Sequence, residues 1–282
     1  MKLAKSGDAY FSLDKLDQYI LDQSNIKLSD DKNEDYYYID TNLNKLNKNK
    51  NKHCSLFPTE EQIKKMDLNK GKNEICFAIE TYLGGVQIIK SNIYFWPHDI
   101  KMILWDIDGT VTKSDILGVI LPRIGINWNH EGVIELINKM NENGYKIVYL
   151  TARAIFQSVA THEFLGKIEE NGKKLPNGPI IMDPDGIFSS FKKGIIQKQQ
   201  YLIKILSLIE IKNLFGNEDN NQPFYAGFGN KETDAIAYRY LGIPMKNIFI
   251  INTSSTIVQL GEKEKTTYPK LIESCEDYFT KI

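Results

Sequence analysis

The stretch Met102-Ile-Leu-Trp-Asp106-Ile-Asp108-Gly-Thr110 decides the fold class. Its apolar run, ended by an aspartate, predicts a short strand that is buried on both faces. Asp106 and Asp108 come where this strand ends, and Gly109 lets the backbone turn sharply there. Two close carboxylates repel each other unless a cation neutralises them. The stretch therefore predicts a strand end that holds a hard divalent cation such as Mg²⁺.

The pattern of a short apolar run followed by a helical stretch repeats after residue 101. Expected strands are Met102–Asp106, Lys146–Leu150, Pro179–Met182, Phe224–Phe228 and Asn247–Ile251, with helices near 131–143, 153–170, 193–210 and 231–241. Short apolar strands that alternate with helices predict an α/β domain with a parallel sheet covered on both faces. Ligands of such sheets bind beyond the carboxyl ends of the strands.

Polar side chains follow the other expected strands. Thr151 and Arg153 come after the second strand, and Arg153 offers a guanidinium suited to phosphate. Asn230 and Asp234 follow the fourth strand. Each residue taken alone fits a structural role, such as a turn or a helix N-cap. Their occurrence together, at the ends of successive strands, favours one shared site.

A lysine in the helix before the fourth strand can reach the same crevice. Lys198 is our first choice for this position. The residues leave three alternatives open, which are Lys192, Lys193 and Lys204.

The first third of the chain has a different pattern. Apolar residues alternate over 73–79, Gly84-Gly85 follows, and a second apolar stretch ends at Trp96. This pattern predicts an antiparallel hairpin. Asn and Lys fill most of 42–52, a composition that cannot bury apolar surface. We expect a small β domain over 1–98, with a disordered linker at about 14–58, and an α/β domain over 99–282.

Charge and cysteine content exclude several classes of protein. Lys and Arg total 35, and Asp and Glu total 36, so the chain lacks the basic excess of a protein that coats nucleic acid. The three cysteines are widely spaced and form no disulfide framework or zinc motif. No apolar run is long enough to span a bilayer, and the first residues lack the apolar stretch of a signal peptide. We expect a cytosolic or nuclear protein.

Taken together, these residues resemble a known superfamily and one of its families. Four elements of the chain are similar to the four motifs of the haloacid dehalogenase-like phosphohydrolases. They are Asp106–Thr110, Thr151, a lysine near 198, and Gly229-Asn230 with Asp234. Four longer stretches resemble the lipins, which are Mg²⁺-dependent phosphatidate phosphatases: Asp106-Ile-Asp-Gly-Thr-Val-Thr-Lys-Ser-Asp115, Thr151-Ala-Arg-Ala-Ile155, Pro223-Phe-Tyr-Ala-Gly-Phe-Gly-Asn230 and Asp234-Ala-Ile-Ala-Tyr-Arg239.

The resemblance implies a fold and a reaction. The fold is a haloacid dehalogenase-like catalytic domain without a large cap, beside a small immunoglobulin-like β-sandwich. Asp106 attacks phosphorus to form an aspartyl-phosphate, and Asp108 acts as general acid and then base. Mg²⁺ lies between Asp106, the Asp108 main-chain carbonyl and Asn230, and Asp234 orients Asn230 or a metal-bound water. Three further groups bind the phosphate: Thr151, Lys198 and the backbone near Gly109.

The resemblance also implies a lipid substrate. Residues 107–150 and 152–197 leave no room for a large cap, so the site stays open to a head group held in a bilayer. Arg153 and Lys113 are the candidate head-group contacts. We expect a cytoplasmic protein, peripheral on the endoplasmic reticulum or nuclear membrane, whose partner is a membrane surface containing phosphatidic acid. Lipins begin with an amphipathic membrane-binding helix and earlier strands, and we expect this docking element to be absent from the chain.

Three other functions stay open. Related lipid-transfer domains bind phosphatidate without the catalytic aspartates, both of which are present here. The segment Leu117–Leu121 matches the LxxIL pattern through which lipins contact nuclear receptors, although its apolar spacing also fits a buried helix face. A phosphatase of the same superfamily with a soluble substrate is the third alternative, because fold does not fix substrate.

Overall fold

The structure of the chain is a computed structural model that describes residues 2–3, 9–10, 58–81, 85–113, 129–183, 196–215 and 222–282. The chain divides into two compact units, Met1–Asn69 and Lys70–Ile282. The expected linker, apart from residue 58, lies outside the described residues, as does Leu117–Leu121.

The first unit contains little described structure. Strand β1 (Lys2–Leu3) pairs antiparallel with β2 (Ala9–Tyr10). Helix α2 (Glu60–Lys65) begins after Thr59, whose hydroxyl accepts a hydrogen bond from the Gln62 backbone N–H at 3.3 Å. The Gln62 side chain in turn accepts one from the Thr59 backbone N–H at 2.7 Å. This reciprocal pair satisfies two backbone donors at the helix start.

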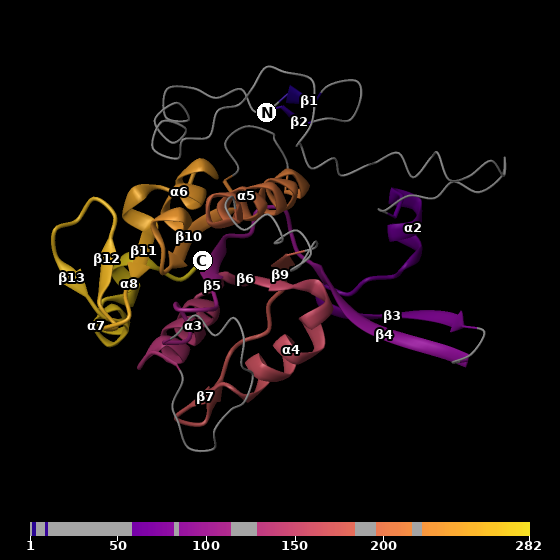
Figure 1. The fold of residues 1–282 in the computed structure, drawn as a ribbon, viewed down its shortest axis with the longest axis horizontal. Helices are drawn as coiled ribbons and strands as arrows, with labels where there is room; N and C mark the ends of the chain where they lie inside the picture. Colours follow the sequence, from indigo (N-terminus) through magenta and orange to yellow (C-terminus); the bar gives the residue numbers. More distant parts are fainter. Residues whose placement is uncertain are drawn as a thin grey trace. The chain divides into compact units, whose positions relative to one another are not determined.

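A seven-stranded sheet forms the centre of the second unit (Figure 1). Its strand order is β13-β12-β11-β10-β5-β6-β9. The strands are β5 (Met102–Asp106), β6 (Lys146–Ala154), β9 (Ile180–Asp183), β10 (Phe224–Gly229), β11 (Ile248–Ile251), β12 (Ile257–Gln259) and β13 (Lys265–Thr266). The five strands from β11 to β9 are parallel, and β12 and β13 add an antiparallel edge. The predicted α/β class with a mainly parallel sheet is confirmed.

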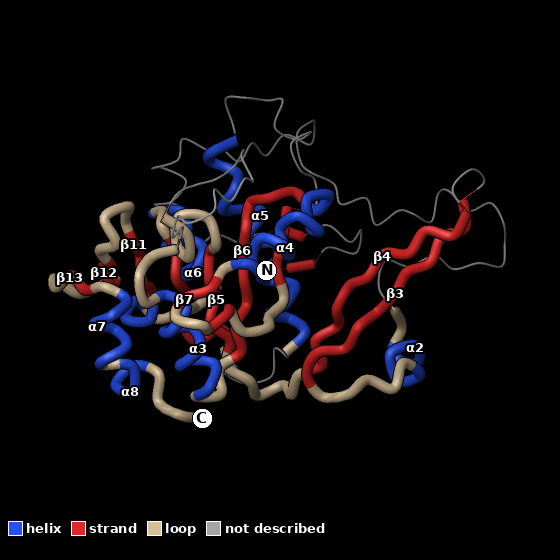
Figure 2. Tube along the Cα trace, turned by 90° about the horizontal axis from the view of Figure 1, so that it is seen from below, coloured by secondary structure: helices blue, strands red, loops and turns tan. Residues whose placement is uncertain are grey.

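Helices lie on both sides of this sheet (Figure 2). Their bounds are α3 (Val133–Glu142), α4 (Ser158–Lys167), α5 (Ile196–Leu214), α6 (Glu232–Tyr240), α7 (Tyr268–Glu273) and α8 (Cys275–Tyr278), with 3-10 turns η2 (Ile155–Gln157) and η4 (Met245–Asn247). Side chains of α3, α7 and α8 share one buried apolar cluster with the sheet, and side chains of α5 and α6 share the other. The described hairpin of β7 (Glu169–Glu170) and β8 (Lys173–Lys174) lies outside the sheet.

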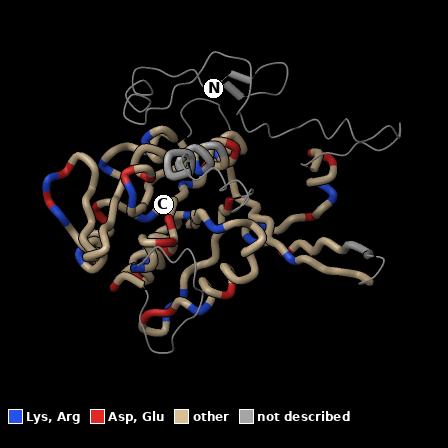
Figure 3. Tube along the Cα trace, in the orientation of Figure 1, with Lys and Arg blue, Asp and Glu red and all other residues tan. Residues whose placement is uncertain are grey.

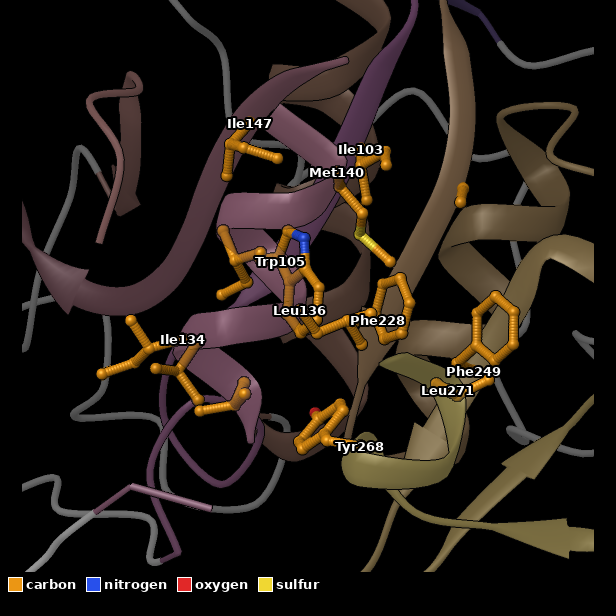
Figure 4. Close-up of a cluster of buried hydrophobic side chains, with 14 of the residues drawn as sticks. Ile103, Trp105, Ile134, Leu136, Met140, Ile147, Phe228, Phe249, Tyr268 and Leu271 are labelled. Atoms are coloured by element: carbon orange, nitrogen blue, oxygen red, sulfur yellow. The ribbon is translucent and has the colours of Figure 1, made fainter. Parts of the chain in front are cut away.

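Strand β5 is buried on both faces, which explains its continuous apolar run. Successive side chains of a strand point to opposite faces, so Ile103 and Trp105 enter one cluster while Met102 and Leu104 enter the other. The Trp105 ring stacks on Phe228 of β10 with ring centroids 3.9 Å apart. Phe228 stacks on Phe249 of β11 with ring centroids 4.6 Å apart. Figure 4 shows Trp105, Phe228 and Phe249 within one buried cluster. These stacked rings join three adjacent strands in one core.

The order of the strands reverses direction beside β5. Strand β6 follows β5 on one side, whereas β10 lies on the other side of β5. Connections therefore leave the carboxyl ends of β5 and β10 in opposite directions, and side chains at these ends face a shared opening. Asp106 ends β5, and Gly229 ends β10.

The predicted hairpin is confirmed. Strands β3 (Gly71–Thr81) and β4 (Gly85–Phe95) pair antiparallel along their whole length, and Phe77 lies opposite Ile89. Phe77, Ile88 and Ile89 are solvent-exposed. The described residues of 1–98 form this ribbon, α2 and the β1–β2 pair, so the immunoglobulin-like sandwich stays a prediction.

Charged side chains of both signs are interspersed along the described chain (Figure 3). Among the described residues, no helix has the length and apolar character that crossing a membrane requires.

The stacked rings generate a stability prediction. Phe228→Ala should lower the free energy of unfolding by about 3–5 kcal/mol, because it removes a fully buried ring and leaves a cavity. Leu214→Ala is the matched control: Leu214 is 82% exposed, so its truncation should change stability by less than about 0.5 kcal/mol. Urea denaturation followed by tryptophan fluorescence measures both. Equal effects of the two substitutions would contradict this account of the core.

Candidate active site

The backbone after β5 makes a tight turn that is held from several sides. The Ile107 N–H donates to the Leu150 carbonyl at 2.9 Å, which extends the pairing of β5 with β6 by one residue. The Val111 N–H then bonds back to the Ile107 carbonyl at 3.0 Å. Gly109 has φ +85°, a conformation that costs a residue with a side chain extra energy. The turn places Asp106 and Asp108 at the same edge of the sheet.

Residues far along the chain support this turn. The Tyr268 hydroxyl of α7 donates to the Thr110 carbonyl at 3.0 Å. The buried His130 donates its backbone N–H to the Val111 carbonyl at 3.1 Å. Its Nδ1 lies 2.8 Å from the Ser255 hydroxyl oxygen. Burial lowers the pKa of His130, so the neutral ring is favoured. These contacts fix the backbone that carries the two aspartates.

Asp106 is paired with a lysine from α5. Lys204 Nζ lies 2.6 Å from Asp106 Oδ1 and 2.7 Å from Asp234 Oδ1, so one ammonium group bridges two buried carboxylates. The other oxygen of Asp106 lies 3.5 Å from the Thr110 hydroxyl, which is long for a hydrogen bond. Among the residues that the structure describes, this weak donor is thus the only one at that carboxylate oxygen of Asp106.

Asp234 connects this bridge to the end of β10. Its Oδ2 accepts hydrogen bonds from the backbone N–H groups of Asn230 and Lys231 at 3.1 Å and 3.0 Å. The close approach needs glycine at 229, because a Cβ there would lie 2.5 Å from the Asp234 Cβ. The sequence Gly229-Asn230 with Asp234 four residues later is therefore a local structure that fixes the Asn230 backbone beside Lys204.

Asp108 has its own set of donors. Arg153 Nη2 lies 2.8 Å from Asp108 Oδ1, and Arg153 Nε lies 3.3 Å from Oδ2. The Thr151 hydroxyl donates to Asp108 Oδ2 at 2.9 Å. The guanidinium is almost completely buried and lies 4.8 Å from the centre of the Phe164 ring. Its remaining nitrogen, Nη1, is buried without a hydrogen-bond partner among the described residues.

Among the described residues, the site contains five charged groups of mixed sign, four of them buried and one, Lys204, half-buried. The carboxylates are Asp106, Asp108 and Asp234, and the cations are Lys204 and Arg153. Burial raises the pKa of Asp106 to about 7, and repulsion by Asp234 and Asp108 adds to the rise, whereas Lys204 opposes it. The two carboxylates beside it raise the pKa of Lys204 despite its burial. Three carboxylates and two cations leave one negative charge that a further cation would neutralise.

The structure brings most of the sequence-predicted residues together. Asp106, Asp234 and the Asn230 backbone are joined by hydrogen bonds through Lys204, and Asp108 and Thr151 form a second hydrogen-bonded set with Arg153. All four predicted side chains, Asp106, Asp108, Thr151 and Asp234, are buried. Arg153, the expected head-group contact, is paired with Asp108. Lys113 is exposed, and its charge acts on the nearby His130.

The predicted lysine needs a correction. Lys204, one of the alternatives, occupies the place that we assigned to Lys198. Lys198 lies six residues earlier in α5, which is about 9 Å along the axis and a third of a turn around it. The two positions therefore lie on different sides of the helix. A sequence signal exists, because Lys204 lies four residues before the fully buried Leu208 and so shares the face of α5 that meets the sheet.

The chain is similar to a known family and to several named proteins. Residues 54–280 match the family model described as LNS2 (Lipin/Ned1/Smp2). The chain is 44% identical to "Phosphatidate phosphatase PAH1" of Arabidopsis thaliana over 71% of this chain and 22% of that protein. It is 39% identical to "Phosphatidate phosphatase LPIN3" of Homo sapiens over 81% of this chain and 27% of that protein.

A yeast relative and one solved structure complete the comparison. The chain is 41% identical to "Phosphatidic acid phosphohydrolase 1" of Saccharomyces cerevisiae over 71% of this chain and 24% of that protein. A chain in "Structure of Pnkp1/Rnl/Hen1 complex" aligns with 54% of this chain and 46% of its own length, at 18% identity and a TM-score of 0.32, which is too low to support an argument. The chain spans about a quarter of the length of these curated relatives. The family match covers most of the chain, which belongs to the LNS2 (Lipin/Ned1/Smp2) family.

Proposed function

We propose that this chain is the catalytic part of a Mg²⁺-dependent phosphatidate phosphatase, which hydrolyses phosphatidic acid to diacylglycerol and phosphate. The observation that carries the proposal is the pair of buried aspartates at the end of β5, each held by a different cation. Relatives named as phosphatidate phosphatases support the choice of substrate. A binding module would have no need for two carboxylates in an acidic, buried site.

The proposed fold is haloacid dehalogenase-like for residues 99–282 and immunoglobulin-like for residues 1–98. The parallel sheet with its acidic crevice at the carboxyl end of β5 supports the first assignment. The β3–β4 ribbon supports the second, because a two-stranded ribbon with exposed apolar residues needs further strands to be stable. The proposed domain boundary follows residue 98. The two compact units divide earlier, after residue 69, so the β3–β4 ribbon belongs to the same unit as the α/β sheet.

The residues of the site fit a divalent cation. The uncompensated negative charge and the raised pKa of Asp106 both favour an additional positive charge next to that carboxylate. The described residues hold no group of three His, Cys, Asp or Glu side chains arranged for a metal ion. The proposed ligand set is instead the Asp106 carboxylate, the Asp108 main-chain carbonyl and Asn230, with Asp234 orienting Asn230 through the hydrogen bond to its N–H. When bound, Mg²⁺ neutralises phosphate charge and orients the transferring group.

Asp106 is the proposed nucleophile. Its Oδ2, which has only the weak Thr110 contact, attacks phosphorus as the bond from phosphorus to the glycerol oxygen breaks. Lys204 holds the other oxygen and fixes the orientation of the carboxylate. The backbone N–H groups near Gly109 and the Lys204 ammonium stabilise the charge of the transferring group.

Asp108 is the proposed general acid and base. It gives its proton to the leaving glycerol oxygen, then takes a proton from the water that hydrolyses the aspartyl-phosphate. Arg153 and Thr151 hold its carboxylate oxygens by hydrogen bonds before substrate binds. A phosphate dianion competes with Asp108 for the Arg153 guanidinium, which binds phosphate in a bidentate manner. Substrate would thereby release Asp108 from the guanidinium.

The proposed partner is a membrane surface that contains phosphatidic acid. Arg153 and Lys113 are the proposed head-group contacts, and the buried donor Nη1 of Arg153 supports the first of them. Peripheral attachment to the endoplasmic reticulum or nuclear membrane is the proposed location. A nuclear partner of Leu117–Leu121 has no support in the described residues, because that segment lies outside them.

The first prediction concerns the nucleophile. The chain should release phosphate from phosphatidic acid in detergent mixed micelles with Mg²⁺, and Asp106→Asn should reduce the rate on the order of 10³-fold or more. Asp277→Asn is the control, because Asp277 is exposed on α8 and α8 lies at the end of the sheet away from the site. The residue just after α8, Phe279, accepts a hydrogen bond from Asn143, which lies near the amino end of β6. Circular dichroism checks that all three proteins fold. Phosphate release by Asp106→Asn at a tenth of the wild-type rate or above would contradict the assignment, and lipid binding by a folded but inactive wild type would favour a binding module.

The second prediction separates the two lysines. Lys204→Met should abolish turnover, and it should destabilise the fold by about 3–5 kcal/mol because two buried carboxylates lose their partner. Lys198→Met should keep both activity and stability near those of the wild type. The measurements are phosphate release and the urea midpoint. An inactive Lys198→Met beside an active Lys204→Met would reverse the assignment.

A further inference from the structure

Three large apolar side chains are exposed next to the active site. Ile155, Phe156 and Val159 are 57%, 65% and 71% exposed, and they lie within five residues on η2 and the first turn of α4. Single exposed apolar residues are common on protein surfaces, whereas a contiguous group marks a site of interaction. We call these three residues the apolar ridge.

The apolar ridge is held rigidly. The Ala154 N–H donates to the Gln157 side-chain oxygen at 3.2 Å, which fixes the turn that begins the ridge. Ile155 and Val159 are four residues apart along a helical stretch, so their side chains are neighbours on one face. On the inner side of the same helix, Phe164 lies under the Arg153 guanidinium at 4.8 Å. The ridge therefore has a fixed position relative to Arg153.

The apolar ridge lies where the active-site strand ends. It starts two residues after Arg153, at the carboxyl end of β6, and α4 leads away from that end (Figure 1). Further along the exposed face of α4 the side chains are polar, with His162 and Glu163 exposed, while Thr161 and Leu165 are buried on the opposite face. Only the end of the helix that adjoins the site is apolar on its exposed face.

The chemistry of the substrate identifies the occupant of this surface. Phosphatidic acid is an amphiphile whose phosphate is joined through a short glycerol ester to two acyl chains. With the phosphate at Asp106 and Arg153, the ester region and the bilayer surface lie within one head-group length of the reacting atoms. Apolar side chains at the rim of the site would meet the boundary between head groups and acyl chains, where amphipathic surface helices bury their apolar faces.

We propose that the apolar ridge inserts into the surface of the bilayer that holds the substrate, so that the catalytic part of the chain has its own membrane contact. This inference rests on the proposed function. A soluble monoester substrate would make no contact that needs three exposed apolar side chains beside Arg153. A substrate embedded in a bilayer places the bilayer surface next to these side chains.

The test compares one headgroup in two physical states. Wild type and Phe156→Ser/Val159→Ser, both as the full 282-residue chain, are assayed with Mg²⁺ on dioleoyl phosphatidic acid in phosphatidylcholine vesicles and on dihexanoyl phosphatidic acid dissolved as monomers. The double substitution should lower the rate on vesicles, at low lipid, by about tenfold or more, because two apolar side chains lose their contact with the bilayer. Its rate on the monomeric substrate should be unchanged. Leu214→Ser is the matched control. Leu214 is exposed at the end of α5, which leads to the amino end of β10, whereas the site lies at the carboxyl ends of the strands.

A second variant reports contact directly and keeps the apolar surface. Phe156→Trp should retain activity on vesicles, and the emission of the introduced indole should move to shorter wavelength when phosphatidylcholine vesicles with phosphatidic acid are added. The wild type, measured in parallel, gives the emission of the native tryptophans for subtraction. The monomeric lipid should leave the emission of the introduced indole unchanged.

Each outcome decides between the two proposals. A wild type that releases phosphate from neither lipid overturns the proposed function itself. If the wild type hydrolyses both lipids and the double variant equals it on vesicles, the proposed function stands and the membrane role of the ridge is overturned. Equal losses on vesicles and monomers would likewise overturn insertion, as would an active Phe156→Trp protein whose emission does not change on vesicles.

Discussion

The Lys204 ammonium bridges Asp106 and Asp234 at 2.6 Å and 2.7 Å, and the assembly of the site depends on this contact. It joins α5 to the end of β5 and to the first turn of α6, three elements that are far apart in the sequence. Without the lysine, two buried carboxylates would face each other with no counter-charge, an arrangement that proteins avoid by protonation or unfolding. The bridge therefore sets both the position of the Asp106 carboxylate and the packing of two helices on the sheet.

A second ion pair complements the first. Arg153 and Thr151 hold Asp108 from β6, so each aspartate of the turn is bound to a different neighbouring element. This division gives two carboxylates two residues apart different surroundings, because one is oriented by an ammonium and the other by a guanidinium, and the different roles that we propose for them rest on it. The same guanidinium rests on Phe164 of α4, so the helix that carries the apolar ridge also positions a group of the site.

Local patterns predicted much of the fold, because the five parallel strands are apolar runs bounded by polar turns and the β3–β4 ribbon alternates at Ile75 and Phe77. Positions at strand ends predicted Asp106, Asp108 and Thr151, since the topology alone brings these ends together. Lys204 was missed because the choice between Lys198 and Lys204 depends on the rotational phase of α5 against the sheet, which the spacing of Lys204 from Leu208 indicates. The antiparallel edge was missed because strands of two or three residues, such as β12 and β13, carry no periodic signal. The ion pair of Arg153 with Asp108 was missed because no local sequence pattern encodes a contact between residues on different strands.

The central claim is that the phosphoryl group passes through the Asp106 carboxylate. The most direct measurement is mass spectrometry of peptides from the chain after rapid acid quenching during turnover of phosphatidic acid. The account predicts a transient mass increase of one phosphoryl group on the peptide that spans β5 and the following turn, located at Asp106 and removed by hydroxylamine. Active turnover with no phosphorylated Asp106 at any quench time, or with the phosphoryl group on another residue, would contradict it.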